Sequence, residues 1–146
     1  MKSYHYPIYL KYCFREMADN KIILGYAGVR GLCQPIRNLC AYLNIAFEDK
    51  LFLDRNEYVE KVKPTLQTNF PNVPYMLDGD KCLTESEAIL LYLVFKAGRV
   101  DLLGTSNEEK VHMVQIKSFF IDTRKAVADI FYNKECDVEK LLQEKV

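Results

Sequence analysis

One stretch of the sequence decides the fold, Phe70-Pro71-Asn72-Val73-Pro74-Tyr75-Met76-Leu77-Asp78-Gly79-Asp80-Lys81-Cys82-Leu83-Thr84. Its first part is rich in turn-forming residues and leads into a short apolar strand at residues 75–77. Asp78-Gly79 strongly favours a tight hairpin turn, so residues 81–83 are expected to return as the antiparallel partner strand. The stretch therefore predicts a β-hairpin in the middle of the chain.

The residues before this hairpin predict a strand, a helix and a second strand. Residues 21–26, a short apolar run, and residues 46–53 are expected to form the two strands. Between them, apolar residues recur with the spacing of one helix face: Leu32, Ile36, Leu39, Cys40 and Leu43. A strand, a helix and a strand at this spacing form a βαβ unit, in which the strands pair in parallel through a right-handed crossover.

The residues after the hairpin predict a further helix. Thr84 and Glu87 have the spacing of a capping box. The apolar helix that they open ends at Gly98, a residue typical of helix C-termini. A shorter helix is expected around residues 57–63, so the first domain, residues 21–99, runs βαβ, hairpin, helix.

The remaining residues predict a helical region of different character. After a linker at residues 99–105, Ser106 and Glu109 form a second capping box before a long helix at residues 108–131. This helix is apolar on more than one face and therefore expects two packing partners. The region, residues 105–146, lies near the ~40-residue limit below which a unit rarely builds its own core. We therefore expect the sequence to be shorter than the architecture to which it belongs.

The overall composition excludes several classes of protein. Of the 146 residues, 49% are hydrophobic and 27% are charged, an ordinary globular balance that argues against disorder. The 20 basic and 20 acidic residues cancel, so the total charge favours neither nucleic acid nor an anionic membrane. The longest apolar runs are too short to span a bilayer. We predict no nucleic-acid partner, no membrane span and a cytoplasmic location.

The cysteines argue against a disulfide framework. They are five in number and no two have CxxC spacing. With only two histidines in the chain, a structural zinc site is not expected either. Most of the cysteines lie among apolar neighbours, which indicates small buried thiols in a reducing compartment.

Residues 1–20 are expected to form an N-terminal extension outside the core. Residues 1–16 carry four tyrosines and no clear helical or strand period. They lack the unbroken apolar core of a secretory signal. A mitochondrial presequence stays open as an alternative, because three Lys and Arg residues precede the first acid, Glu16. Met17 is an alternative start of the chain.

Three places in the first domain have residue types suited to ligand binding. Tyr26 ends the first strand and faces the turn into a helix, where α/β sheets bind ligands, and its phenol can donate to a thiolate or an oxyanion. Asn72-Val73-Pro74 offers backbone N–H and C=O groups to an extended peptide-like ligand, around a peptide bond that proline allows to be cis. Glu85-Ser86 begins a helix whose N–H groups attract a carboxylate, while Glu85 itself suits an ammonium.

Each of these places also has a simpler structural interpretation. The alternatives are a half-buried tyrosine at Tyr26, a plain turn at Asn72-Val73-Pro74 and N-capping alone at Glu85-Ser86. Taken together, the three places describe a site for a small ligand that carries both an ammonium and a carboxylate.

These residues give the sequence a resemblance to the glutathione transferases, most closely to the mu class. The resemblance covers about residues 21–142 and is carried by Ile23-Leu24-Gly25-Tyr26, Val29-Arg30-Gly31-Leu32, Phe70-Pro71-Asn72-Val73-Pro74-Tyr75, Asp78-Gly79 and Thr84-Glu85-Ser86-Glu87-Ala88-Ile89-Leu90. It implies a thioredoxin-like α/β N-terminal domain followed by an all-α C-terminal domain, incomplete in this chain. It also implies an enzyme that conjugates the glutathione thiol to electrophilic small molecules.

The resemblance implies roles for five residues of the first domain. Tyr26 would hydrogen-bond to the glutathione thiolate, and such a bond lowers the pKa of the thiol from its ordinary ~8.5. Val73 would pair through its backbone with the cysteinyl part of glutathione, with Asn72 beside it. Glu85 and Ser86 would hold the γ-glutamyl end.

Four further roles are implied. Lys63 would lie near the glycine carboxylate of glutathione, and Leu32 would line the floor of the pocket. Asp122 would reach the glutathione of the other subunit, and Tyr132 would face the electrophile. Without the resemblance, Asp122 is a solvated helix residue and Tyr132 a core aromatic. The resemblance thus implies a homodimer, with glutathione as co-substrate and with no bound cofactor and no metal.

The chain departs from the mu pattern at one informative position. Ala27 stands where mu enzymes usually have tryptophan, and the chain contains no tryptophan at all. The segment at residues 54–69 is also shorter than in mu enzymes. Two other interpretations stay open. One is a non-catalytic transferase-like structural or binding subunit. The other is a thioredoxin-type redox protein, for which Cys33 is the thiol near the start of the first helix, although no CxxC motif stands there.

Overall fold

The computed structural model describes residues 21–132. These residues belong to two compact units with a boundary between Arg99 and Val100, and each unit is described by itself. The predictions made for residues 1–20 and for residues 133–146 lie outside the described residues.

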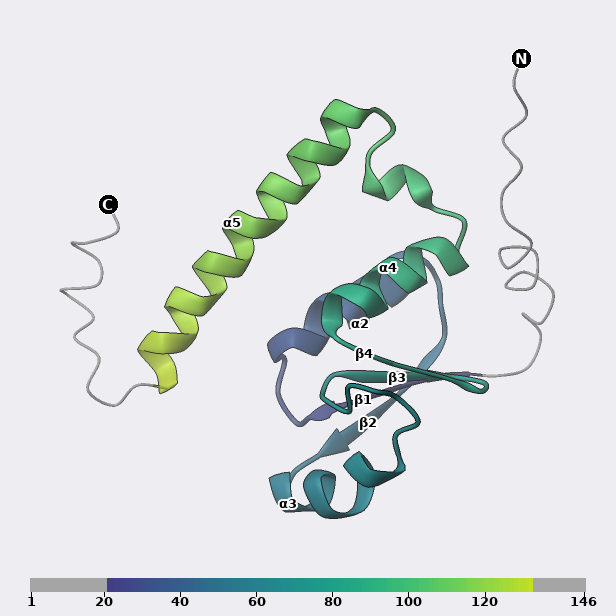
Figure 1. The fold of residues 1–146 in the computed structure, drawn as a ribbon, viewed down its shortest axis with the longest axis vertical. Coiled ribbons are helices and arrows are strands. Elements are labelled where there is room, and N and C mark those ends of the chain that lie inside the picture. The colour runs from purple at the N-terminus through teal and green to yellow at the C-terminus, as the bar shows by residue number, and fades with distance from the viewer. Residues whose placement is uncertain (1–20, 133–146) are drawn as a thin grey trace. The chain divides into compact units, whose positions relative to one another are not determined.

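The first unit is built on a four-stranded mixed sheet with strand order β2-β1-β3-β4 (Figure 1). The strands are β1 (Ile22–Ala27), β2 (Phe47–Phe52), β3 (Tyr75–Asp78) and β4 (Lys81–Thr84). β1 and β2 pair in parallel, whereas β3 pairs antiparallel with both β1 and β4. The predicted parallel unit and hairpin are therefore confirmed. Gly79 in the hairpin turn has a φ of 61°, a conformation that glycine adopts without strain.

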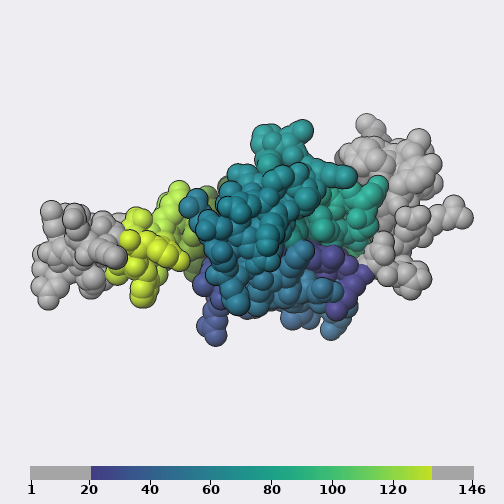
Figure 2. Space-filling view, turned by 90° about the horizontal axis from the view of Figure 1, so that it is seen from below, coloured from purple at the N-terminus to yellow at the C-terminus, as the bar shows by residue number. Residues whose placement is uncertain are grey.

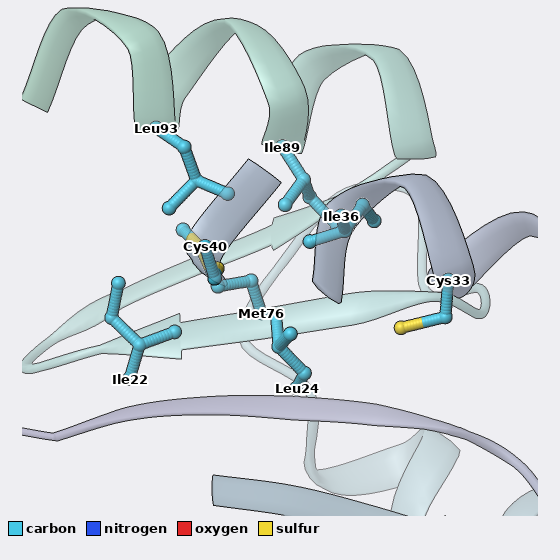
Figure 3. Close-up of a cluster of buried hydrophobic side chains, with 8 residues drawn as sticks. All are labelled: Ile22, Leu24, Cys33, Ile36, Cys40, Met76, Ile89 and Leu93. Carbon is cyan, nitrogen blue, oxygen red and sulfur yellow. The ribbon is translucent and has the colours of Figure 1, made fainter. Parts of the chain in front are cut away.

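Two helices cover one face of this sheet, α2 (Gln34–Tyr42) and α4 (Ser86–Lys96) (Figure 1). A 3₁₀ turn, Gly31–Cys33, leads into α2, and Pro35 falls in the first turn of the helix, where its missing N–H costs nothing. Sheet and helices share one core, whose buried members are Ile22, Leu24, Cys33, Ile36, Cys40, Met76, Ile89 and Leu93 (Figure 3). Alternate residues of β1 and β3 supply the sheet side of this core, as the two-residue strand period requires.

The segment between β2 and β3 covers the opposite face of the sheet. It contains α3 (Arg55–Glu57), a wide π turn (Tyr58–Val62) and a 3₁₀ turn (Lys63–Thr65), so the short helix predicted here is present with irregular turns. Figure 2 looks onto this segment, which is drawn in blue-teal. Its main contact is an aromatic cluster of Phe52, Tyr58 and Tyr75, with the Phe52 and Tyr58 ring centroids 5.6 Å apart. The sheet is thus covered on both faces.

The capping box predicted at Thr84 and Glu87 is wrong. Thr84 is the last residue of β4, and its hydroxyl donates to the backbone carbonyl of Phe70 at 2.7 Å. The residue that precedes α4 is Glu85, which has a φ of +68° and makes no side-chain cap bond. The Thr84 hydroxyl is therefore bonded to a residue distant in sequence, whereas the local spacing predicted that it would cap the helix.

The end of α4 follows the sequence prediction. Gly98 has a φ of 67°, and its N–H donates to the carbonyl of Phe95 at 3.0 Å. The N–H of Arg99 donates to the carbonyl of Val94, also at 3.0 Å. These two bonds form a Schellman motif, which satisfies the last carbonyls of the helix.

The second unit begins with a 3₁₀ helix, Val100–Leu103, in the segment predicted as a linker, and continues with α5 (Asn107–Tyr132). The second capping box is confirmed, because Glu109 N–H donates to Ser106 Oγ and Ser106 N–H donates to Glu109 Oε2, both at 3.1 Å. Hydrogen bonds from Thr105 and from Ser106 lower the pKa of the Glu109 carboxyl. α5 is apolar on more than one side and buries none of its own residues. Across residues 21–132, every helix is too short or too polar to cross a membrane.

Candidate functional site

The strand register brings the three predicted places to one edge of the sheet. Gly25 of β1 pairs with Tyr75 of β3, and Tyr75 pairs with Thr84 of β4. Tyr26 follows Gly25, the Val73–Pro74 bond precedes Tyr75, and Glu85 follows Thr84, so all three leave the sheet at the same edge. Segments that are up to about sixty residues apart in sequence therefore become neighbours through strand pairing alone.

The Tyr26 hydroxyl is fixed by the turn that follows β1. The backbone N–H of Leu32 donates to this oxygen at 3.2 Å. The turn approaches the phenol closely, since a Cβ added to Gly31 would lie 2.6 Å from the Tyr26 oxygen, and Gly31 has a φ of +39°. Glycine is required here on both counts. A hydroxyl that accepts one hydrogen bond still has its own proton to donate, so this phenol can serve as donor to a ligand.

The second place is the loop that enters β3. The Val73–Pro74 peptide bond is cis, a conformation that the proline allows. Pro74 is fully buried, and Val73 is half-buried against the aromatic cluster around Tyr75. The hydrogen bond from Thr84 to the Phe70 carbonyl fastens the start of this loop to β4. The loop is therefore held at both of its ends, and it carries the backbone of Val73 beyond the β3 ladder.

The third place is the start of α4, and it is linked to the second. Asn72 Nδ2 donates to Glu85 Oε1 at 3.2 Å, with both side chains exposed. The bond uses one carboxylate oxygen and leaves lone pairs on the other for a cation. Ser86 is half-buried as the first residue of α4, where unpaired backbone N–H groups and the helix dipole favour an anion. An acid and a helix N-terminus thus stand side by side, as a ligand with an ammonium and a carboxylate needs.

Six of the nine predicted site residues are brought together by these contacts, namely Tyr26, Leu32, Asn72, Val73, Glu85 and Ser86. Lys63 begins the 3₁₀ turn Lys63–Thr65 and has an exposed side chain. Asp122 is exposed on α5, and Tyr132 ends that helix with 83% of its surface accessible. Both belong to the second unit. The functional roles of all nine residues stay predictions.

An ion pair near Tyr26 was not found from the sequence. Arg37 of α2 binds the Asp49 carboxylate of β2 with Nε–Oδ2 at 2.7 Å and Nη2–Oδ1 at 3.1 Å. Its Nη1 also donates to the Val29 carbonyl at 3.3 Å. Opposite charges on the helix and the second strand of one βαβ unit are the only sequence signal for this pair, and they equally suit two solvated residues.

Cys33 and Cys40 belong to the buried core of the first unit. Cys33 and Cys40 are fully buried, and burial raises the pKa of both thiols, that of Cys40 to about 11. For Cys33, the Arg37 guanidinium opposes this rise and the Asp49 carboxylate adds to it. A protonated, buried thiol is a poor nucleophile, so the thioredoxin-type redox interpretation finds no support at Cys33. Among residues 21–132, no cluster of three metal-binding side chains occurs.

Comparison with known proteins shows which family the first unit resembles. The family model described as glutathione S-transferase, N-terminal domain, matches residues 24–94. The first unit is similar to the N-terminal domain of the glutathione S-transferases. The match includes Tyr26, the cis Val73–Pro74 bond and Glu85-Ser86, and it ends before Asp122 and Tyr132.

Individual glutathione S-transferases show the same similarity. The chain is 40% identical to the class-mu 26 kDa isozyme of Schistosoma mansoni, over 81% of this chain and 60% of that protein. It is 37% identical to glutathione S-transferase Mu 1 of Oryctolagus cuniculus, over 83% of this chain and 56% of that protein. The crystal structure of the glutathione S-transferase Blo t 8 is similar with a TM-score of 0.69 and 35% identity, over 83% of this chain and 54% of that chain. This chain therefore spans somewhat more than half the length of these relatives.

Proposed function

We propose that this chain is a glutathione transferase that conjugates the glutathione thiol to electrophilic small molecules. Glutathione is the co-substrate, and no bound cofactor takes part. The observation that carries the proposal is the Tyr26 hydroxyl, which accepts the Leu32 N–H at 3.2 Å and keeps its proton for a ligand. It lies at the sheet edge from which the Val73–Pro74 bond and the start of α4 also extend.

The polar and charged groups at this edge suit the charges of glutathione. The backbone of Val73 pairs with the cysteinyl part, which directs the thiol toward Tyr26. Glu85, oriented by Asn72, receives the ammonium of the γ-glutamyl end, and Ser86 at the α4 N-terminus receives its carboxylate. Lys63 carries the charge that a glycine carboxylate requires. Each end of the tripeptide thus meets a group of complementary charge or polarity.

The chemistry follows from the hydrogen bond to sulfur. A free thiol with a pKa of ~8.5 is mostly protonated at neutral pH, and only the thiolate is a strong nucleophile. Donation by the Tyr26 hydroxyl stabilises the thiolate and lowers the thiol pKa, so the proton passes to solvent. The sulfur lone pair then forms the new S–C bond, and a leaving group such as chloride departs with its electron pair. Tyr26 keeps its proton throughout and acts as an electrostatic stabiliser.

Calorimetric titration of the full chain with glutathione tests this function. We expect wild-type binding, binding weaker by about tenfold in Ser86→Ala through loss of a charge-assisted hydrogen bond, and near-normal binding in Tyr26→Phe. The thiol pKa of bound glutathione should rise in Tyr26→Phe. Absence of binding by a folded chain would overturn the proposal. Binding without turnover of any electrophile, an activated aryl chloride included, would favour the non-catalytic subunit instead.

The subunit arrangement and the location belong to the same proposal. We propose that the chain acts as a cytoplasmic homodimer, with Asp122 reaching the glutathione of the partner copy and Tyr132 facing the electrophile. A carboxylate from a second copy suits the polar, ammonium-bearing co-substrate. Light scattering of the purified chain measures the oligomeric state. A monomer that turns over substrate and is unaffected by Asp122→Asn would contradict this part of the proposal alone.

A further inference from the structure

Arg37 ties together three parts of the first unit. Its side chain extends from α2 and is 13% exposed. Two of its nitrogens bind the Asp49 carboxylate of β2, at 2.7 Å and 3.1 Å. Its Nη1 donates to the backbone carbonyl of Val29 at 3.3 Å and, over a longer 3.5 Å, to that of Arg30. A guanidinium bound bidentately by a carboxylate has one preferred orientation, so the remaining nitrogen points toward these carbonyls. The same nitrogen also donates to Gln34 Oε1 at 3.5 Å.

The two carbonyls belong to the loop that supplies the hydrogen-bond donor of Tyr26. Residues 28–30 connect β1 to the turn Gly31–Cys33 before α2, and within that turn the N–H of Leu32 donates to the Tyr26 hydroxyl at 3.2 Å. The loop also places Gly31 against the phenol. Because hydrogen bonds weaken steeply with misalignment, a small displacement of this loop alters how the hydroxyl is held.

Asp49 connects this loop, through Arg37, to strand β2 of the sheet. In the parallel pairing of β1 and β2, Asp49 lies opposite Leu24, which precedes Tyr26 by two residues on β1. The Arg37–Asp49 pair therefore connects the strand beside Tyr26 with the loop after it. The Tyr26 phenol and the Leu32 N–H are thus both held in position relative to the same β-sheet.

We propose that Arg37, oriented by Asp49, is a positioning residue for the Tyr26 hydroxyl in thiol activation. The inference rests on the proposed function, since it concerns how the hydrogen-bond donor of the thiolate is held. Lysine is not an equivalent, because an ammonium lacks the planar fork that reaches a carboxylate and a carbonyl together. A pair with a merely structural role would stabilise the chain and leave the thiol pKa of bound glutathione unchanged.

The test measures the thiol pKa of glutathione bound to the full chain, by titrating the ultraviolet absorbance of the thiolate. We expect Arg37→Met, Arg37→Lys and Asp49→Asn each to raise this pKa by about 0.5 unit, with little change in glutathione affinity. Asp49→Asn is nearly isosteric and keeps the test possible if Arg37→Met does not fold. Lys96→Met is the matched control, because it removes a cation of similar exposure, 18% against 13% for Arg37, from another carboxylate, that of Asp78. It should lower Tm and leave the thiol pKa unchanged.

A double-mutant cycle with Tyr26→Phe shows whether Arg37 acts through the phenol. We expect the shift caused by Arg37→Lys to vanish when the hydroxyl is already absent. The inference alone is overturned if folded Arg37→Lys and Asp49→Asn keep the wild-type thiol pKa, or if the shift persists in the Tyr26→Phe background. If folded wild type binds no glutathione, or if Tyr26→Phe leaves the thiol pKa unchanged, the proposed function fails together with the inference.

Discussion

The ring of Tyr75 occupies the space into which a side chain at Gly25 would project. A Cβ on Gly25 would lie 2.0 Å from Cε1 and 2.1 Å from Cζ of that ring. The two residues pair across β1 and β3, and Tyr75 is 1% exposed with its ring centroid 6.1 Å from that of Phe52. The close approach of ring and backbone therefore requires glycine one residue before Tyr26.

We expect Gly25→Ala to lower the free energy of unfolding by about 1–3 kcal/mol, because the added methyl group would displace a ring that is packed in the core. Urea denaturation measures the loss. The double variant Gly25→Ala/Tyr75→Leu should cost less than the sum of its two single changes, since removing the ring makes room for the methyl group. A Gly25→Ala chain as stable as wild type would contradict the close approach.

Gly31→Ala should disturb the proposed site and not only the backbone. The added methyl group would lie 2.6 Å from the Tyr26 oxygen and would displace the phenol from the Leu32 N–H. Gly98→Ala is the matched control, because Gly98 also has a positive φ, of 67°, but a Cβ there meets nothing within 4 Å. Each change should cost about 1 kcal/mol of backbone strain. Only Gly31→Ala should raise the thiol pKa of bound glutathione, and equal effects of both variants on that pKa would refute the assignment.

Local patterns were sufficient to predict most of the first unit. The β-hairpin follows from the Asp78-Gly79 turn, and the end of α4 follows from Gly98, because in both cases the conformation depends on residues that are adjacent in sequence. Tyr26 and Glu85 could be predicted to lie at one edge of the sheet, because each lies at or just after the end of a predicted strand. The sequence therefore predicted which backbone segments form the site.

Contacts between distant residues could not be predicted in this way. Thr84 has the spacing of a cap, yet its hydroxyl binds the carbonyl of Phe70, fourteen residues earlier. Arg37 and Asp49 are twelve residues apart, and each alone resembles an ordinary solvated charge. Which partner such a polar group takes is decided by packing, because a buried donor or acceptor has to be satisfied by whatever the tertiary fold brings within reach.

Lys96→Met is expected to destabilise the first unit without affecting the site. The Lys96 ammonium lies 2.5 Å from Oδ2 of Asp78, and the Tyr92 hydroxyl donates to the same oxygen at 2.6 Å. Asp78 is only 9% exposed, so loss of the ammonium leaves a buried carboxylate with incomplete compensation. We expect a loss of about 3 kcal/mol, measured by urea denaturation. Asp78→Asn/Lys96→Met, which removes both charges, should recover part of it, and failure to recover any would argue against an uncompensated charge as the cause.

The buried thiols predict a loss of stability at alkaline pH. Burial raises the pKa of Cys40 from 9.0 to about 11, with a further contribution from Cys33, and burial raises that of Tyr75 from 10.0 to about 12. Between the unfolded and folded values, the unfolded chain has released a proton that the folded chain retains. The unfolded state then binds fewer protons, so the free energy of unfolding falls as pH rises, by up to ~1.4 kcal/mol per pH unit for each group.

Urea denaturation at about pH 8 and about pH 10.5 measures this fall, since the first value lies below the titration window of Cys40 and the second lies inside it. Cys40→Ala is expected to be less stable than wild type at the lower pH, because it leaves a small cavity. It should nevertheless lose less stability between the two values, because one of the groups that binds a proton more tightly in the folded state is gone. An equal loss in wild type and Cys40→Ala would show that Cys40 does not contribute, and that the alkaline instability arises from other groups such as Tyr75.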